Sequence, residues 1–155
     1  MPSIFHRIGR WINSSGLFSW PPLVADSQPD KLGLAGEKLA AKFLKGLGYR
    51  ILARSHRQRL GEIDIIALDG NCIVFVEVKT WGSDTEGDPS LAVDRSKQEK
   101  LTRAAAIYLK QKRLLENPAR FDVISIVWNR QSQTQPTIRH FKHAFEAVGY
   151  GQLFY

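Results

Sequence analysis

The sequence has a single cysteine, Cys72, among its 155 residues. A disulfide within the chain is therefore excluded, and so is a zinc site built from several thiolates. No apolar run approaches the roughly 18–20 residues that a membrane-spanning helix needs, and the N-terminal region lacks the continuous apolar stretch of a secretion signal. With 43% hydrophobic residues, we expect a protein of the reducing cytoplasm with one hydrophobic core.

Positive charge is in excess, with a formal net charge of +7, but it is unevenly distributed. Residues 31–60 hold eight lysines and arginines and one acid, and residues 95–130 hold nine and three acids. Between them, residues 61–94 hold eight acids and one lysine. Basic flanks favour a polyanion as partner, whereas a compact acidic segment favours a bound cation. Each run taken alone also fits a solvated face of a helix or loop.

Composition divides the chain into an extension with a linker (1–30), one domain (31–148) and a tail (149–155). Apolar residues between Ile4 and Ile12 recur at helical spacing, which predicts a short amphipathic helix that packs on the domain, a partner or a membrane surface. Prolines and aspartates toward residue 30 mark the linker.

Periodicity within the domain predicts two helices separated by three strands and followed by two more. The expected elements are a helix over 34–47, strands over 49–57, 61–68 and 71–80, a helix over 96–113, a strand over 120–128 and a short strand over 138–145. Ser96 and Glu99 are spaced as a capping box at the start of the second helix. The α-β-β-β-α-β order predicts an α/β (α+β) domain with a mixed central sheet flanked by helices.

Polar groups interrupt the two most apolar strands. Glu62 and Asp64 lie near the start of one strand, and Glu77 and Lys79 lie at the end of the next. Because side chains alternate between the two faces of a strand, the members of each pair share a face. Glu37 lies on the packed side of the first helix.

The turn between these strands decides which acids meet. A two-residue loop, 69–70, puts Glu62 across from Glu77. A four-residue loop, 69–72, puts Asp64 across from Glu77, and either loop leaves the acids on one face. A three-residue loop would separate them. Carboxylates facing each other destabilise a sheet, and a divalent cation would relieve that repulsion.

Three stretches carry a resemblance to a known family: Gly36-Glu37, Gly61–Ala67 and Val74–Thr80. With Lys97-Gln98 and Arg120–Val123, they resemble the YraN-like family of bacterial proteins over about residues 33–146. The resemblance implies a restriction-endonuclease-like PD-(D/E)xK fold, similar in outline to archaeal Holliday-junction resolvases, and a predicted endonuclease activity.

Roles follow from the resemblance position by position. Asp64 and Glu77 would be metal ligands and Lys79 the lysine of the motif. Glu37 would be a helical acid that joins the metal site, and Glu62 and Gln98 would be supporting residues. Ile63 replaces the proline of the motif, and Trp81 stands where many relatives carry a basic residue.

The implied function is hydrolysis of phosphodiester bonds with Mg²⁺ or Mn²⁺, on DNA rather than RNA. Contacts to phosphate carry no sequence information, so we expect selectivity for substrate structure; junction resolution would require a homodimer. The basic residues expected to contact phosphates are Arg50, Arg54, Arg57, Arg59, Arg95, Lys97, Lys100 and Arg103. Two alternatives remain open, a catalytically inactive nucleic-acid-binding protein on the same fold and a protein-interaction adaptor that uses the N-terminal segment.

Overall fold

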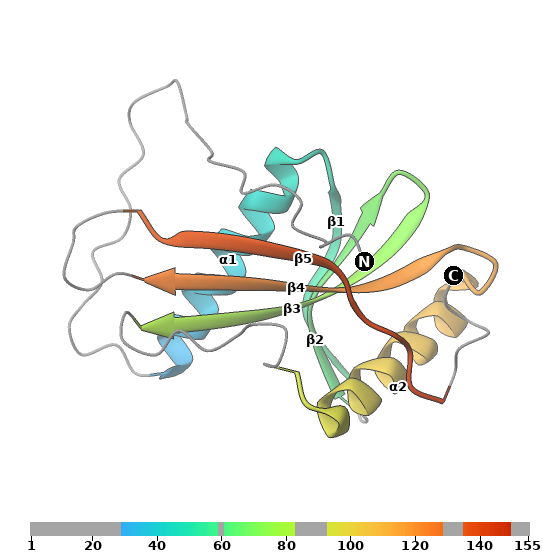
Figure 1. The fold of residues 1–155 in the computed structure, drawn as a ribbon. Helices are drawn as coiled ribbons and strands as arrows, with labels where there is room; N and C mark the ends of the chain where they lie inside the picture. Colours follow the sequence, from blue (N-terminus) through green and yellow to red (C-terminus); the bar gives the residue numbers. More distant parts are fainter. Residues whose placement is uncertain (1–28, 59–60, 83–92, 129–134, 150–155) are drawn as a thin grey trace, which may run out of the picture.

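A computed structural model describes residues 29–58, 61–82, 93–128 and 135–149 (Figure 1). The predicted amphipathic helix near the N-terminus, Arg59 and most of the predicted C-terminal tail lie outside these ranges. Neither helix within them is long and apolar enough to cross a membrane.

Within the described ranges, seven elements form one mixed sheet with a helix on each face. They are α1 (Pro29–Gly46), β1 (Arg50–Gln58), β2 (Gly61–Asp69), β3 (Cys72–Gly82), α2 (Arg95–Lys112), β4 (Ala119–Trp128) and β5 (Thr137–Phe145). The strands lie in the order β1-β2-β3-β4-β5, and only β3 and β4 run parallel. That parallel pair needs a crossover, which α2 supplies on the face opposite α1 (Figure 1). The predicted α/β fold class is confirmed.

Both helix starts differ from the sequence prediction. Helix α1 begins at Pro29, inside the segment expected to be linker, since a proline fits the first turn of a helix. Helix α2 is capped by Asp94, whose carboxylate accepts the backbone N–H of Lys97 at 2.8 Å. The capping box predicted for Ser96 and Glu99 is therefore wrong. The N-cap residue is Asp94, two positions before Ser96, and its carboxylate satisfies a free N–H group of the first turn.

The β2–β3 hairpin turns one residue later than Asp69-Gly70. Asp69 pairs with Cys72 and Leu68 with Ile73, which leaves Gly70 and Asn71 as the loop. Gly70 has a φ of 62°, a conformation that favours glycine at the first position of a tight hairpin loop. The register that places Glu62 across from Glu77 is thus wrong. The observed register is the one that the four-residue alternative gave, in which Asp64 is aligned with Glu77.

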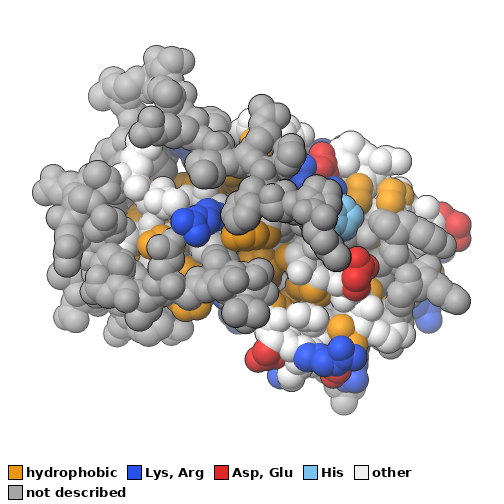
Figure 2. All heavy atoms as spheres, in the orientation of Figure 1, with side chains coloured by type: hydrophobic (Ala, Val, Ile, Leu, Met, Phe, Trp, Pro, Cys, Tyr) orange, Lys and Arg blue, Asp and Glu red, His pale blue; other side chains and the backbone are white. Residues whose placement is uncertain are grey.

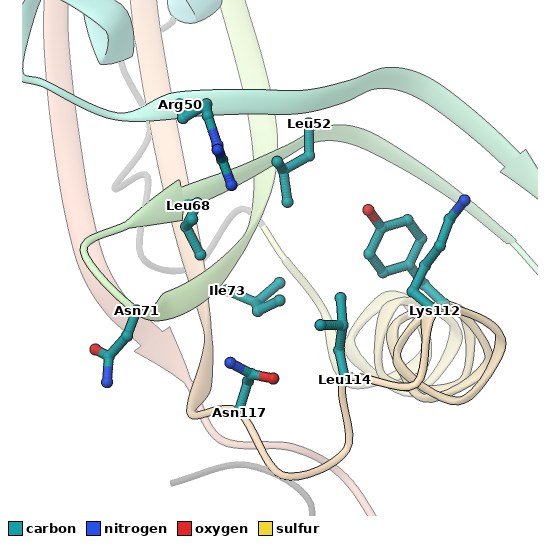
Figure 3. Close-up of a pocket in the computed structure, with 9 residues that line it drawn as sticks. Arg50, Leu52, Leu68, Asn71, Ile73, Lys112, Leu114 and Asn117 are labelled. Atoms are coloured by element: carbon teal, nitrogen blue, oxygen red, sulfur yellow. The ribbon is translucent and has the colours of Figure 1, made fainter.

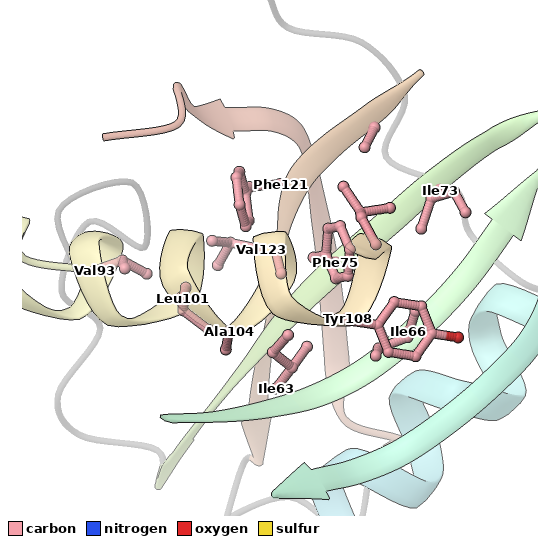
Figure 4. Packing of buried hydrophobic residues seen from close by; sticks show 13 residues of the cluster. Ile63, Ile66, Ile73, Phe75, Val93, Leu101, Ala104, Tyr108, Phe121 and Val123 are labelled. Carbon is pink, nitrogen blue, oxygen red and sulfur yellow. The ribbon is translucent and has the colours of Figure 1, made fainter. Parts of the chain in front are cut away.

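Two hydrophobic clusters hold the helices onto the sheet. On one face, buried side chains of α2 pack on β2, β3 and β4 (Figure 4), among them Leu101, Ala104 and Tyr108. On the other face, Leu39, Ala40 and Leu44 of α1 pack on the opposite side of the same strands. Leu47, the last residue of the helix expected from the sequence, is 48% exposed because α1 ends at Gly46.

Gly36 brings α1 directly onto the end of β3. A Cβ atom at this position would collide with the side-chain hydroxyl of Thr80. The absence of a side chain therefore sets how closely α1, which carries Glu37, approaches the strand that carries Glu77 and Lys79.

Candidate active site

The site lies where β2 and β3 stop pairing. Ile65↔Val76 is the last backbone pair between the two strands on the side away from the hairpin. Beyond it, the Asp64 carboxylate replaces a backbone partner, because its Oδ2 accepts the N–H of Val78 at 2.7 Å. This hydrogen bond holds Asp64 beside β3. If the backbone pairing continued by one residue, Asp64 would pair with Glu77.

Asp64 also lies opposite a residue of β1 with an unusual backbone conformation. The flanking pairs Arg54↔Ile65 and His56↔Ile63 place Ser55 opposite Asp64. Ser55 has a φ of 46°, a left-handed conformation that is uncommon for a residue other than glycine. Ile63 and Ile65 are both fully buried, yet they belong to the clusters on opposite faces of the sheet. The strand therefore changes its facing at Asp64, and such strained positions concentrate at functional sites.

Glu37 reaches the same place from α1. It is half-buried, and its Oε2 accepts a hydrogen bond from the Ser55 hydroxyl at 2.6 Å. The prediction that Glu37 borders the packed side of its helix is confirmed. Ser55 was not singled out by the sequence, since only the register with β2 places it here.

Glu77 is the most buried acid of the group, with 4% of its side chain exposed, and two lysines contact the same one of its oxygens. Lys79 Nζ lies 3.1 Å from Oε1, and Lys97 Nζ lies 3.2 Å from it. The other oxygen, Oε2, is buried and has no hydrogen-bond partner among the residues that the structure describes. A buried carboxylate oxygen without a partner is costly, so this oxygen is where a further positive group would be most stabilising.

The pKa of Asp64 depends on the burial and on the charges of the site. Burial and then the neighbouring charge of Glu77 raise the pKa of Asp64 to about 7, against the lowering effect of the Val78 N–H bond. The charge of Glu37 raises the pKa of Asp64 further, and that of Lys97 lowers it. The four charged groups therefore act on one another, although they come from α1, β2, β3 and α2.

Two carboxylates of this site, rather than three, are available as ligands for a divalent cation. Among the residues that the structure describes, no three His, Cys, Asp or Glu side chains are gathered closely enough to hold a metal ion by themselves. Mg²⁺, however, is commonly bound by one or two carboxylates together with water and substrate phosphate oxygens. Asp64 and the unpartnered Oε2 of Glu77 provide that pair. Glu37 does not belong to the pair and accepts a hydrogen bond from the Ser55 hydroxyl.

The two predicted supporting residues lie in different places. Glu62 is at the rim, where its Oε1 lies 3.0 Å from Arg57 Nε in an exposed ion pair. It does not approach Glu77, because β2 and β3 are no longer paired there. Gln98 is half-buried, and its side-chain amide donates to the Val93 carbonyl at 2.9 Å. It holds the start of α2 in place, immediately beside Lys97.

Most of the predicted phosphate-contacting residues are exposed on β1 and α2: Arg50, Arg54, Arg57, Arg95, Lys100 and Arg103. Two of them have acidic partners, since Arg57 pairs with Glu62 and Arg95 lies 3.7 Å from Glu99. Lys97 differs from the rest, because its side chain turns inward to Glu77. On the face shown in Figure 2, the described basic and acidic side chains are interspersed rather than gathered into one basic surface.

A shallow groove of about 510 Å³ lies elsewhere, between the β2–β3 hairpin and the C-terminal end of α2 (Figure 3). Its floor is apolar, with Leu52, Leu68 and Ile73, and Arg50 and Lys112 stand at its edges. None of the site carboxylates lines it, so the groove and the candidate active site are separate features.

A buried ionic network at the opposite end of β4 was not predicted from the sequence. Arg120 donates to Asp122 at 3.0 Å, to Asp69 at 2.8 Å and to the Tyr49 hydroxyl at 2.9 Å. Asp122 is also 2.8 Å from His140 Nε2. The available signal was an arginine and an aspartate two residues apart in an otherwise apolar strand, which places both on one buried face. Each charged group of this network has an oppositely charged partner, so a role in stabilising the fold accounts for these residues.

Comparison with known proteins places these residues in a family. A family model described as "Uncharacterised protein family UPF0102" matches residues 36–126, which include every carboxylate of the site and both lysines. A UPF0102 protein of Geobacter metallireducens is 50% identical over 115 residues, covering 74% of this chain and 92% of its own. A UPF0102 protein of Geotalea daltonii is 48% identical over 115 residues, covering 74% and 89%, and one of Rhodopirellula baltica is 45% identical over 121 residues, covering 77% and 72%.

Proposed function

We propose that this chain, which belongs to the uncharacterised protein family UPF0102, is a divalent-metal-dependent nuclease that hydrolyses phosphodiester bonds. The family is the YraN-like one to which the sequence is similar. The names of the relatives state no activity, so the proposal depends on the site itself.

One observation carries the proposal: the unpartnered, buried Oε2 of Glu77 beside the half-buried carboxylate of Asp64. A protein that used these acids only for stability would pair each oxygen. A site for a cation leaves an oxygen available and places like charges together despite their repulsion. When bound, the cation would polarise a phosphate and lower the pKa of a bound water.

The other residues have roles that follow from their contacts. Asp64 is oriented by the Val78 N–H, and Glu77 by the lysines on its Oε1. The Lys79 ammonium, 30% exposed, is placed to stabilise negative charge that develops on a phosphate. Ser55 holds Glu37 facing the same group of acids.

As substrate we propose DNA, recognised by its structure and bound in the cytoplasm. The exposed basic residues of β1 and α2 support contacts to phosphate, and such contacts position a nucleic acid without reading its sequence. Cleavage of four-way junctions would further require two copies of the chain, each with one site.

The experiment incubates the purified chain with labelled duplex, single-stranded and four-way-junction DNA and with RNA, each with Mg²⁺, Mn²⁺ or EDTA. Asp64→Asn and Lys79→Met are expected to abolish cleavage, since they remove the negative charge and the ammonium. Glu116→Gln, an exposed acid on the turn after α2, is the matched control and should cleave normally. Salt-sensitive binding without cleavage in any metal would favour an inactive nucleic-acid-binding protein, and neither binding nor cleavage would favour an adaptor.

A further inference from the structure

The start of α2 is built to deliver one side chain to Glu77. The Asp94 carboxylate caps the helix through the Lys97 N–H, and the Gln98 amide fixes the preceding Val93 carbonyl. Both contacts hold the backbone on either side of Lys97. From this anchored position the Lys97 ammonium reaches to 3.2 Å from Glu77 Oε1, while 36% of its side chain stays exposed.

One lysine would be enough to neutralise Glu77. Lys79, two residues along the same strand, already lies 3.1 Å from Oε1. The second ammonium instead acts on the site as a whole, because its charge opposes the mutual repulsion of the carboxylates of Glu37, Asp64 and Glu77. Buried charges need such compensation.

A divalent cation between Asp64 and Glu77 would upset this balance. Two positive charges would be added beside two ammonium groups, and like charges a few ångström apart repel strongly in a partly buried site. Lys79 is tethered to the strand beside Glu77, whereas Lys97 stands on another element and has the more exposed side chain of the two. The repulsion is therefore relieved most readily by Lys97.

We propose that Lys97 is an exchangeable counter-ion of the site: it occupies Glu77 Oε1 without a metal, is released when a divalent cation binds, and then contacts the substrate phosphate. The inference rests on the proposed function and makes Lys97 a substrate-binding residue. It assigns Lys97 a different role from the exposed lysines and arginines of α2, which stay in solvent throughout.

The first experiment uses the wild-type chain. Lysines are modified by brief acetylation with and without Mg²⁺, and the extent at each lysine is measured by mass spectrometry. With Mg²⁺, modification of Lys97 is expected to rise at least about threefold as its ion pair is lost, while Lys100, exposed one turn further along α2, should not change. Titration calorimetry in the same buffer shows whether Mg²⁺ binds.

The second experiment compares Lys97→Met with the control Glu116→Gln, which should match wild type in both affinities. Loss of the competing ammonium should make Mn²⁺ bind about three- to tenfold more tightly, whereas KM for DNA should rise at least about fivefold because a phosphate contact is lost. Lys97→Arg should restore KM. Opposite changes in the two affinities separate this role from a structural one, which would weaken both and lower Tm.

The outcomes are distinguishable. If Mg²⁺ binds and Lys97 modification does not change, the inference is wrong while the proposed function stands, and this holds even if the methionine variant does not fold. Mn²⁺ affinity that is unchanged or weaker in folded Lys97→Met would also overturn it. Absence of any cation binding to the wild-type chain would overturn the inference and the proposed function together.

Discussion

Asp64 and Val78 are joined by a side-chain to backbone hydrogen bond of 2.7 Å, at the point where two neighbouring strands of the sheet have ceased to pair. The bond places a carboxylate where a sheet would ordinarily have a carbonyl. It explains how Asp64 is held beside Glu77 although their mutual repulsion would drive them apart. The predictions below test this arrangement and the packing around it.

Asp64 is expected to destabilise the metal-free fold. Its pKa, raised to about 7 by burial and by Glu77, exceeds the value of about 3.9 in an unfolded chain. The folded state therefore loses stability as pH rises through this window. In EDTA, Asp64→Asn should be more stable than wild type by about 1–3 kcal/mol near pH 8 and by less near pH 5. Urea unfolding at both pH values measures this.

For Asp64→Asn, the asparagine can still accept the Val78 N–H through its carbonyl oxygen, so the variant isolates the charge. An unchanged or lower stability near pH 8 would show that Asp64 is not held in an unfavourable environment. Glu116→Gln is the matched control and should unfold as wild type does.

Gly36→Ala should destabilise the fold by about 1–3 kcal/mol, because the new methyl group must displace Thr80. Gly33→Ala lies one turn earlier on α1 with nothing within 4 Å of the new Cβ, so it should stabilise by about 0.5–1 kcal/mol through helix propensity. Thermal unfolding of both variants gives the comparison. Adding Thr80→Ala should recover most of the loss at Gly36, and additive effects in this double-mutant cycle would exclude the contact.

Asp122 should determine how the free energy of unfolding decreases at acidic pH. Burial alone would raise the pKa of Asp122, but hydrogen bonds from His140 and Arg120 outweigh burial and hold it below the ordinary value. Its contribution is therefore present above about pH 4 and lost as pH falls through the lowered folded pKa. Asp122→Asn should cost on the order of 3 kcal/mol near pH 7, because Arg120 is left without a buried counter-charge.

The difference between wild type and Asp122→Asn should shrink between about pH 5 and pH 3, where the wild-type carboxylate begins to be protonated. Urea midpoints across this range measure it. A constant difference would mean that the charge of Asp122 contributes nothing beyond its shape and hydrogen bonds.

Ser125 and Thr102 form a matched pair of buried hydroxyl groups. Ser125 Oγ has no hydrogen-bond partner, whereas Thr102 Oγ1 accepts the Val148 N–H at 3.1 Å. Ser125→Ala should leave stability unchanged or raise it by up to about 1 kcal/mol, and Thr102→Val should lower it by about 1–2 kcal/mol. Chemical denaturation compares them, and equal losses at both positions would contradict the assignment of Ser125 as unpartnered.

Features that depend on residues close together in the sequence could be predicted, whereas features that depend on contacts between distant residues could not. Asp64, Glu77 and Lys79 were singled out as polar residues that interrupt the apolar β2 and β3, because such an interruption is a local feature of the sequence. The turn was placed one residue early, since Asp69-Gly70 is itself a strong turn signal. Asp69 instead stays in the strand, where its carboxylate contacts Arg120, a residue distant in sequence.

Contacts between distant elements were beyond such reasoning. Ser55 reads as an ordinary strand residue until the β1 register places it opposite Asp64. Lys97 reads as one of several basic residues on α2, and its inward direction depends on how the crossover helix begins. Arg120 and Asp122 read as isolated polar residues, because their partners come from β2 and β5.

The early end of β2–β3 pairing has a mechanical consequence. Beyond Ile65 and Val76 the sheet continues as two ribbons, β1 with β2 and β3 with β4 and β5, joined only by the five residue pairs nearest the hairpin. Where backbone pairing has ended, the two ribbons are held together by side chains, namely the buried clusters on both faces and the bond from Val78 to Asp64. The separation of Asp64 from Glu77 is thus set by side-chain contacts rather than by a backbone ladder.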